Sequence, residues 1–225
     1  MTIPFIKKLG DALAPYTLVL LLLSAVLTVS AMTLALIFIE PPHSHGGGEQ
    51  GEFPAQELRV ADVPPSFSFV NQEGTPVTLE SLRGKIVMIT GVFATCHTAC
   101  PTIIEQAKSA VESLTPEQRA KVAIVAITLD PENDTQEKRA MTAEAHDLEA
   151  PLFNYVNGDD PETVASVLDD FKFARGPKDP ETGVMGHVNM YVLIDKTGKI
   201  AYRLTLGSAE EHWVSDALKV LVDEA

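Results

Sequence analysis

The sequence has few cysteines and few positive charges. Only two of its 225 residues are cysteine, and its 17 lysines and arginines are outnumbered by 31 aspartates and glutamates, which gives a formal net charge of −14. Two thiolates alone do not complete a metal site, so any such site needs a ligand from elsewhere in the chain. The acidic balance argues against electrostatic binding to nucleic acid or anionic lipid heads. It suits cations or a basic partner surface, or simply favours solubility.

Charge is also missing near the N-terminus, where no charged residue occurs from 12 to 39. Residues 17–39 exceed the roughly 20 apolar residues that cross a bilayer, and they are too long for the apolar region of a secretory signal, which has about 7–15. We therefore expect an uncleaved transmembrane anchor at 17–39 and not a buried core helix, although Val29-Ser30-Ala31 resembles a cleavage site.

The charges before the anchor predict its orientation. Lys7 and Lys8 place residues 1–16 in the cytoplasm under the positive-inside rule. The protein is thus expected to be a single-pass protein of the inner membrane, with its soluble domain in the periplasm or another extracytoplasmic space.

Residues 40–63 are interpreted as a flexible linker, because they contain Pro41-Pro42 and Gly46-Gly47-Gly48 and few aromatic residues. His43 and His45 lie in this segment and offer two imidazoles to a transition metal. Paired histidines in a glycine-flanked segment are more often part of the linker alone.

The remaining residues, 64–225, are predicted to form one α/β domain without internal repeats. Apolar periodicity predicts a hairpin at 67–79 with a helical turn at 79–82, strands at 86–93, 121–129, 153–156, 187–195 and 200–206, helices after Pro101 and at 136–147, 161–171 and 209–222, and a loop at 174–186. This order is typical of a thioredoxin-like sandwich with an N-terminal hairpin. In proteins with open α/β sheets, bound ligands lie at the carboxyl ends of the strands.

Both cysteines lie at such a position. Cys96 follows the strand, and Cys100 is expected in the first helical turn, with Pro101 at the first helical position and the helix dipole favouring a thiolate. Residues four apart on a helix have Cβ atoms about 5–6 Å apart, whereas a disulfide needs about 3.5–4.5 Å. A structural disulfide therefore needs a distortion, and buried thiols are a further alternative. Two thiolates at this spacing can instead bracket a soft metal ion such as Cu(I) or zinc.

Four segments in order resemble the Sco/SenC family of membrane-anchored copper proteins, which help to assemble the copper A centre of cytochrome c oxidase. They are Cys96-x-x-x-Cys100-Pro101, Leu129-Asp130-Pro131-Glu132-Asn133-Asp134-Thr135, Gly176-Pro177-Lys178-Asp179, and His187 just before Tyr191-Val192-Leu193-Ile194-Asp195. The resemblance covers about 65–225 and includes the anchor. It implies that Cys96, Cys100 and His187 bind copper, as Cu(I) or Cu(II). The implied partner is the copper A-bearing subunit of the oxidase or another exported copper protein.

The histidines have alternative interpretations. Many members of the family carry Pro-Asp near the positions of His97 and Thr98, so His97 adds a candidate ligand or proton donor, or is an exposed loop residue. His187 without the resemblance is an ordinary strand-end histidine. His146 and His212 are interpreted as surface residues of helices.

Two functions use the same thiols. The first is a metallochaperone that delivers copper to the copper A site, and the second is a thiol–disulfide oxidoreductase that reduces the cysteines of the oxidase subunit or of another exported copper protein. His187 distinguishes the two functions, because a reductase needs no imidazole from a distant part of the sequence. A peroxidase is disfavoured, since peroxide chemistry does not call for this set of ligands. Because His187 follows the polar loop at 174–186, we also expect it to move relative to the dithiol.

Overall fold

The computed structural model of the chain describes Val19 and residues 52–179, 181, 185–205 and 212–224. Residues 53–225 make one compact unit. Within the described ranges no helix is both long and apolar enough to cross a membrane. The anchor expected at 17–39 falls outside these ranges apart from Val19, as do His43 and His45 of the linker.

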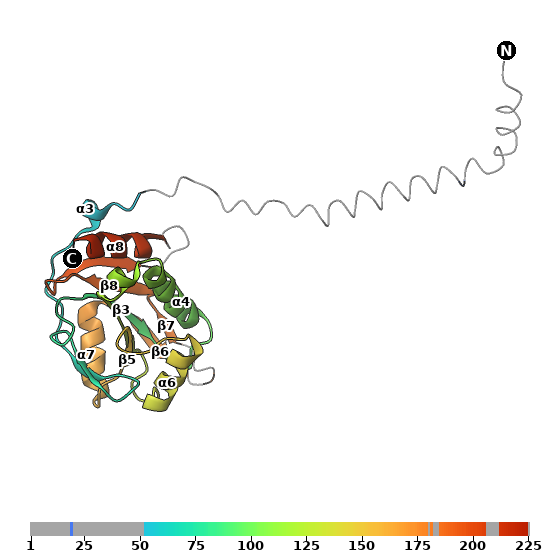
Figure 1. The fold of residues 1–225 in the computed structure, drawn as a ribbon. Coiled ribbons are helices and arrows are strands. Elements are labelled where there is room, and N and C mark those ends of the chain that lie inside the picture. Colours follow the sequence, from blue (N-terminus) through green and yellow to red (C-terminus); the bar gives the residue numbers. More distant parts are fainter. Residues whose placement is uncertain (1–18, 20–51, 180, 182–184, 206–211, 225) are drawn as a thin grey trace, which may run out of the picture. The chain divides into compact units, whose positions relative to one another are not determined.

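A five-stranded sheet forms the middle of the domain (Figure 1). Its strands, in spatial order, are β5 (Phe153–Val156), β4 (Val122–Thr128), β3 (Ile86–Val92), β8 (Met190–Ile194) and β9 (Ile200–Thr205). β3 is parallel to β4 and antiparallel to β8. Every residue of β3 and β4 is buried, as expected for inner strands made of Val, Ile and Ala runs.

Helices cover the sheet. They are α4 (Ala99–Glu112), α5 (Pro116–Arg119), α6 (Gln136–Ala145), α7 (Pro161–Phe171) and α8 (His212–Asp223). α4 packs against α8, and α6 packs against β5. In Figure 1, α4 and α6 lie towards one side of the strands and α7 towards the other. The arrangement is the predicted thioredoxin-like α/β sandwich.

A hairpin precedes the sheet, as predicted. β1 (Ser68–Val70) and β2 (Pro76–Thr78) pair antiparallel in a small sheet of their own. The helical turn expected at 79–82 is only a set of hydrogen-bonded turns, in which the Leu82 N–H donates to the Leu79 carbonyl at 3.2 Å.

The folded domain begins earlier than predicted. A short helix, α3 (Ala55–Leu58), occurs in the segment interpreted as linker, and the Val60 N–H donates to the Ala201 carbonyl at 2.8 Å. Phe53 is only 7 % exposed and meets Tyr202 edge to face, with ring centroids 5.1 Å apart. The linker prediction at 40–63 is therefore wrong from Phe53 onward. All of the segment's glycines and two of its three prolines lie before Phe53. A single aromatic residue that packs against the core leaves no periodic pattern in the sequence.

Phe53 is therefore expected to contribute to stability. We predict that Phe53→Ala lowers the free energy of unfolding by about 2–3 kcal/mol, because it removes a buried ring and leaves a cavity beside Tyr202 and Trp213. Urea unfolding followed by circular dichroism measures the change. Val63→Ala is the matched control, since Val63 is 84 % exposed and should change stability by less than about 0.5 kcal/mol. Equal midpoints for the two variants would contradict the new domain boundary.

The loop predicted at 174–186 is partly a β-ribbon. β6 (Arg175–Lys178) and β7 (Met185–His187) pair antiparallel, and Arg175 lies opposite His187. The strand predicted to begin at His187 is therefore wrong at its start, because β8 begins at Met190. Arg, Gly, Pro and Lys in β6 give no apolar alternation, so the pairing left no signal in the sequence.

Candidate metal centre

Cys96 lies in a tight turn just after β3. Its backbone N–H donates to the Phe93 carbonyl at 3.0 Å, and the residue is 8 % exposed. The N–H of Ala94, in the same turn, donates to both carboxylate oxygens of Asp134 at 3.1 Å. The end of a buried strand and a buried carboxylate therefore fix the segment that carries the first thiol.

Cys100 is the second residue of α4, which begins at Ala99. Pro101 is consequently the third helical residue, not the first as predicted. The side chain of the N-cap residue, Thr98, makes no capping bond, and the Cys100 N–H donates to the Cys96 sulfur at 3.3 Å. The first turn of a helix leaves N–H groups without helical partners, so Cys96 accepts one of them.

The two thiols differ in acidity. Burial raises the pKa of Cys96, but hydrogen bonds from Cys100 and Thr98 outweigh burial and place the pKa below its ordinary value. Burial, together with the hydrogen bond to Cys96, raises the pKa of Cys100 far above its ordinary value. The helix terminus therefore favours a thiolate on Cys96, and the prediction of a thiolate on Cys100 is wrong. Both cysteines are free thiols.

This difference predicts selective alkylation. In the metal-free reduced protein at pH 7, iodoacetamide should modify Cys96 at least about tenfold faster than Cys100, because the thiolate is the nucleophile. Peptide mass spectrometry over time measures both rates. Unfolding in urea is the control and should bring the two rates close together. Faster modification of Cys100 in the folded protein would contradict the assignment.

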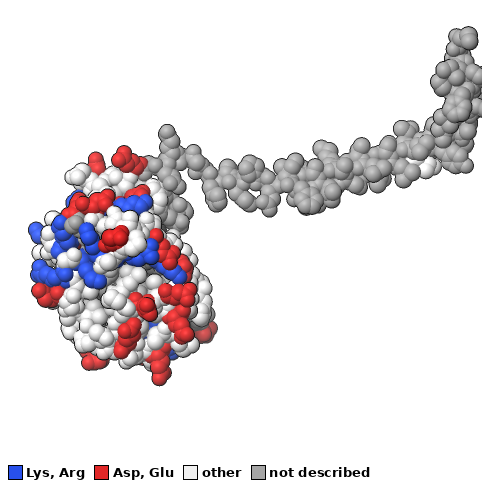
Figure 2. Space-filling view, viewed as in Figure 1, with Lys and Arg blue, Asp and Glu red and all other residues white. Residues whose placement is uncertain are grey.

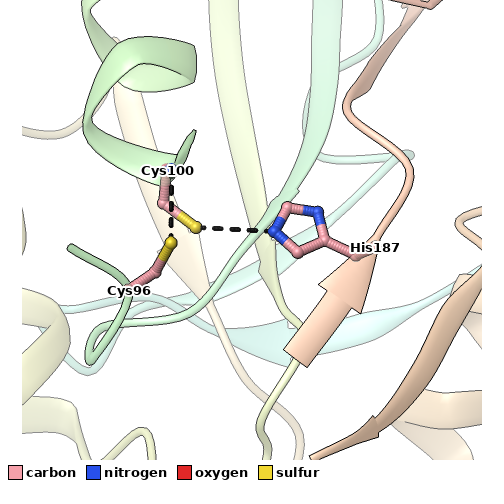
Figure 3. A group of neighbouring side chains, drawn as sticks. All are labelled: Cys96, Cys100 and His187. Carbon is pink, nitrogen blue, oxygen red and sulfur yellow. Dashed lines mark hydrogen bonds between the residues drawn. The ribbon is translucent and has the colours of Figure 1, made fainter. Parts of the chain in front are cut away.

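His187 reaches the thiols because of the sheet register. β8 runs antiparallel to β3, with Tyr191 opposite Thr90, so the residues just before β8 lie beside the carboxyl end of β3. The Thr90 hydroxyl donates to the Met190 carbonyl at 3.0 Å and fixes this crossing. His187 Nε2 consequently lies 3.8 Å from the Cys100 sulfur (Figure 3). The pairing of β6 with β7 places His187 near the dithiol. The movement of His187 relative to the dithiol stays a prediction.

The environment of His187 favours a neutral ring. Burial lowers its pKa below the ordinary value, so near pH 7 the imidazole keeps a lone pair for a metal ion. The Phe93 ring meets the imidazole edge to face, with centroids 5.8 Å apart, and so limits its rotation.

One donor atom from each of Cys96, Cys100 and His187 forms a cluster, and the three atoms lie within 4.8 Å of one another. Ligands about 2.0–2.3 Å from a shared ion, as for zinc, are at most about 4.6 Å apart. Shifts of a few tenths of an ångström let the three atoms bind one ion. Two sulfurs and an imidazole form a soft set that suits copper or zinc and leaves a position open.

The other histidines within the described residues stand outside this cluster. His97 is exposed. His146, predicted to be a surface residue, is half-buried, and its Nδ1 lies 2.5 Å from a carboxylate oxygen of Glu105. His212, also predicted to be a surface residue, is half-buried at the start of α8, where its ring meets Trp213.

Residues 55–222 match the family profile described as SCO1/SenC. The chain belongs to the SCO1/SenC family. Its relatives include a protein named SCO1 protein homolog from Bacillus subtilis, which is 28% identical over 155 residues, or 68% of this chain and 77% of the relative.

Two solved structures of the family resemble this SCO1/SenC protein. ScoI from Bradyrhizobium japonicum, solved with copper bound, has a TM-score of 0.54 and 26% identity over 71% of this chain and 99% of that one. BsSco is described as having a disulfide switch and as a member of the Sco family of cytochrome c oxidase assembly proteins. Its TM-score is 0.62, and it is 23% identical over 74% of this chain and 97% of that one.

Asp134 was missed in the sequence and lies behind the site of this SCO1/SenC protein. It is 1 % exposed and accepts hydrogen bonds from the Thr128 hydroxyl at 2.7 Å, the Tyr155 hydroxyl at 2.6 Å and the Ala94 N–H. Burial raises its pKa, while these donors oppose the shift. Asp134 therefore joins β4 and β5 to the turn that carries Cys96.

A signal for Asp134 existed in the sequence. It belongs to one of the four segments that resemble the family, and it lies between the strand predicted at 121–129 and the helix predicted at 136–147. Residues at such a place often cap a helix, and Thr135 does cap α6 by accepting from the Lys138 N–H at 3.3 Å. A helix has a single N-cap residue, and in α6 this residue is Thr135. The neighbouring carboxylate of Asp134 therefore needs another role, and its place between an inner strand and a helix is the signal for one.

Two hollows flank Cys96 in this SCO1/SenC protein. One, of about 340 Å³, lies between α4 and α6, and its lining includes Pro101, Met141 and His146. The other, of about 300 Å³, faces β7 and is lined in part by Met185 and His187. The first thiol therefore borders two accessible spaces, although it is itself almost fully buried.

Proposed function

We propose that this SCO1/SenC protein is a copper metallochaperone that binds copper through Cys96, Cys100 and His187. The three-donor cluster carries the proposal, because it brings two cysteine sulfurs and an imidazole nitrogen together at the span of one ion. The copper-bound structure of the relative from Bradyrhizobium japonicum supports copper over zinc.

The geometry suits a protein that passes copper on. Three ligands leave a position at which a partner's thiolate can bind before the donors of this chain dissociate, so copper need never be free. Cys96 faces two hollows, which leaves room for an incoming side chain. We propose the copper A-bearing subunit of cytochrome c oxidase as the recipient, or another exported copper protein.

The same proposal includes the cellular location of the domain. An exported recipient requires the domain outside the cytoplasm, and the apolar run at 17–39 supplies a membrane anchor of the right length, with residues 1–16 inside. The acidic and basic side chains visible in Figure 2 lie partly apart, with basic ones gathered in the upper half of this face. The overall charge of −14 favours a recipient surface with positive charge.

The acidity of Cys96 supports a second function, that of a thiol–disulfide oxidoreductase. A Cys96 thiolate attacks a partner's disulfide and forms a mixed disulfide, with one partner sulfur released and protonated. Cys100 then loses its proton and attacks Cys96, which releases the second partner thiol and leaves a Cys96–Cys100 disulfide. The partner gains two electrons and two protons, and this chain loses them.

Copper titration of the full-length protein tests the proposed chaperone. The reduced protein should bind one copper ion per chain, and the protein oxidised at Cys96 and Cys100 should bind none, since both sulfur lone pairs are then lost as thiolate ligands. Undiminished binding by the oxidised protein would show that the cysteines are not the ligands. No binding in either state would remove the chaperone and leave the oxidoreductase.

A further inference from the structure

Met185 shares a strand face and a hollow with the proposed copper site. It begins β7, two residues before His187, and side chains two apart on a strand point to the same face. Gly186 between them is exposed, whereas Met185 and His187 are both half-buried. Both also line the hollow of about 300 Å³ that Cys96 borders.

We propose that Met185 is a fourth, thioether donor to copper in this protein and that it favours Cu(I). The inference rests on the proposed copper-binding function. Thioether sulfur is a soft ligand and selects Cu(I), and the cluster of three donors leaves a position open on the bound ion. A weak ligand at that position stabilises copper in transit and yields to a partner's thiolate, which is the stronger ligand.

The ordinary role for a methionine here is apolar filling, since Met185 also packs against the core. The two roles differ in what leucine can replace. Leucine has a similar volume and fills the same space, but it has no sulfur. Met185→Leu therefore removes the proposed ligand and keeps the packing.

The chain offers a matched control. Met141 is 67 % exposed and lines the hollow on the α6 side of Cys96, away from β7. Met141→Leu makes the same chemical change in the other hollow that Cys96 borders, and it should leave copper binding unaltered.

The first measurement compares affinities in the full-length reduced protein. Competition with a chromophoric Cu(I) chelator should show Met185→Leu binding Cu(I) about tenfold more weakly, with Cu(II) binding within about twofold. The midpoint potential of bound copper should consequently fall by about 59 mV for this one-electron couple. Met141→Leu should match the parent protein in all three quantities.

The second measurement detects the ligand itself. Copper-edge X-ray absorption on selenomethionine-labelled protein loaded with Cu(I) should show a selenium at bonding distance in the parent protein and in Met141→Leu, but not in Met185→Leu. Copper bound without a selenium neighbour, and with equal affinities, would overturn the role of Met185 and leave the proposed function intact. A parent protein that binds no copper would overturn both.

Discussion

His187→Ala is expected to weaken copper binding by the reduced protein about a hundredfold and to leave thiol–disulfide exchange within about twofold of the parent rate. The variant removes one of three donors that lie within 4.8 Å of one another. Losing even a group that only orients a ligand costs 10–100-fold in metal affinity, so losing the ligand should reach the upper end of that range. A hundredfold corresponds to about 2.7 kcal/mol.

The imidazole is not needed for exchange between thiols. Cys96 owes its low pKa to hydrogen bonds within the segment 96–100, and none of these comes from His187. Copper affinity by chelator competition and the rate of reaction with a small disulfide therefore report separately on the two proposed functions.

His97→Ala is the control for this experiment. His97 lies beside Cys96 in sequence but is exposed and is not part of the donor cluster. It should bind copper within about threefold of the parent protein. If His187→Ala keeps parental affinity while exchange continues, the three-ligand chaperone fails and the oxidoreductase is favoured.

The parts of the fold with strong apolar patterns could be predicted from the sequence. β3 and β4 are buried on both faces, and α7 was predicted with its observed bounds, because Pro161 starts it and its apolar residues recur at helical spacing. The β6–β7 ribbon and the packing of Phe53 could not be predicted. A polar two-stranded pairing and a single aromatic anchor depend on distant partners and leave no local period.

The candidate site was predictable in part for a similar reason. Cys96 and Cys100 stand out because they are the only cysteines, but His187 was singled out only through the family resemblance. Its position depends on the antiparallel register of β8 on β3, which a local pattern does not encode. The acidity of the thiols was predicted for the wrong cysteine, since burial of the Cys100 side chain outweighs its place in the helix.

Asp134 was missed because an aspartate before a helix is usually a cap, and its actual partners come from β4, β5 and the turn after β3. Asp134→Ala is expected to lower the free energy of unfolding by about 4 kcal/mol. The change leaves the buried hydroxyls of Thr128 and Tyr155 and the Ala94 N–H without their acceptor, and each unsatisfied buried group costs about 1–3 kcal/mol. Urea unfolding of the metal-free protein measures the loss.

Asp134→Asn separates the hydrogen bonds from the bulk of the side chain. The amide keeps one oxygen as acceptor but adds two N–H donors, so a loss of about 2 kcal/mol is expected. Because the Ala94 N–H positions the turn that carries Cys96, both variants should also let iodoacetamide reach Cys100 faster than in the parent.

Thr135→Ala is the control, because it removes only the neighbouring helix cap. It should lower the free energy of unfolding by about 1 kcal/mol and leave both alkylation rates unchanged. A loss below about 1 kcal/mol in Asp134→Ala, with parental alkylation, would mean that the turn holds its thiol without the carboxylate.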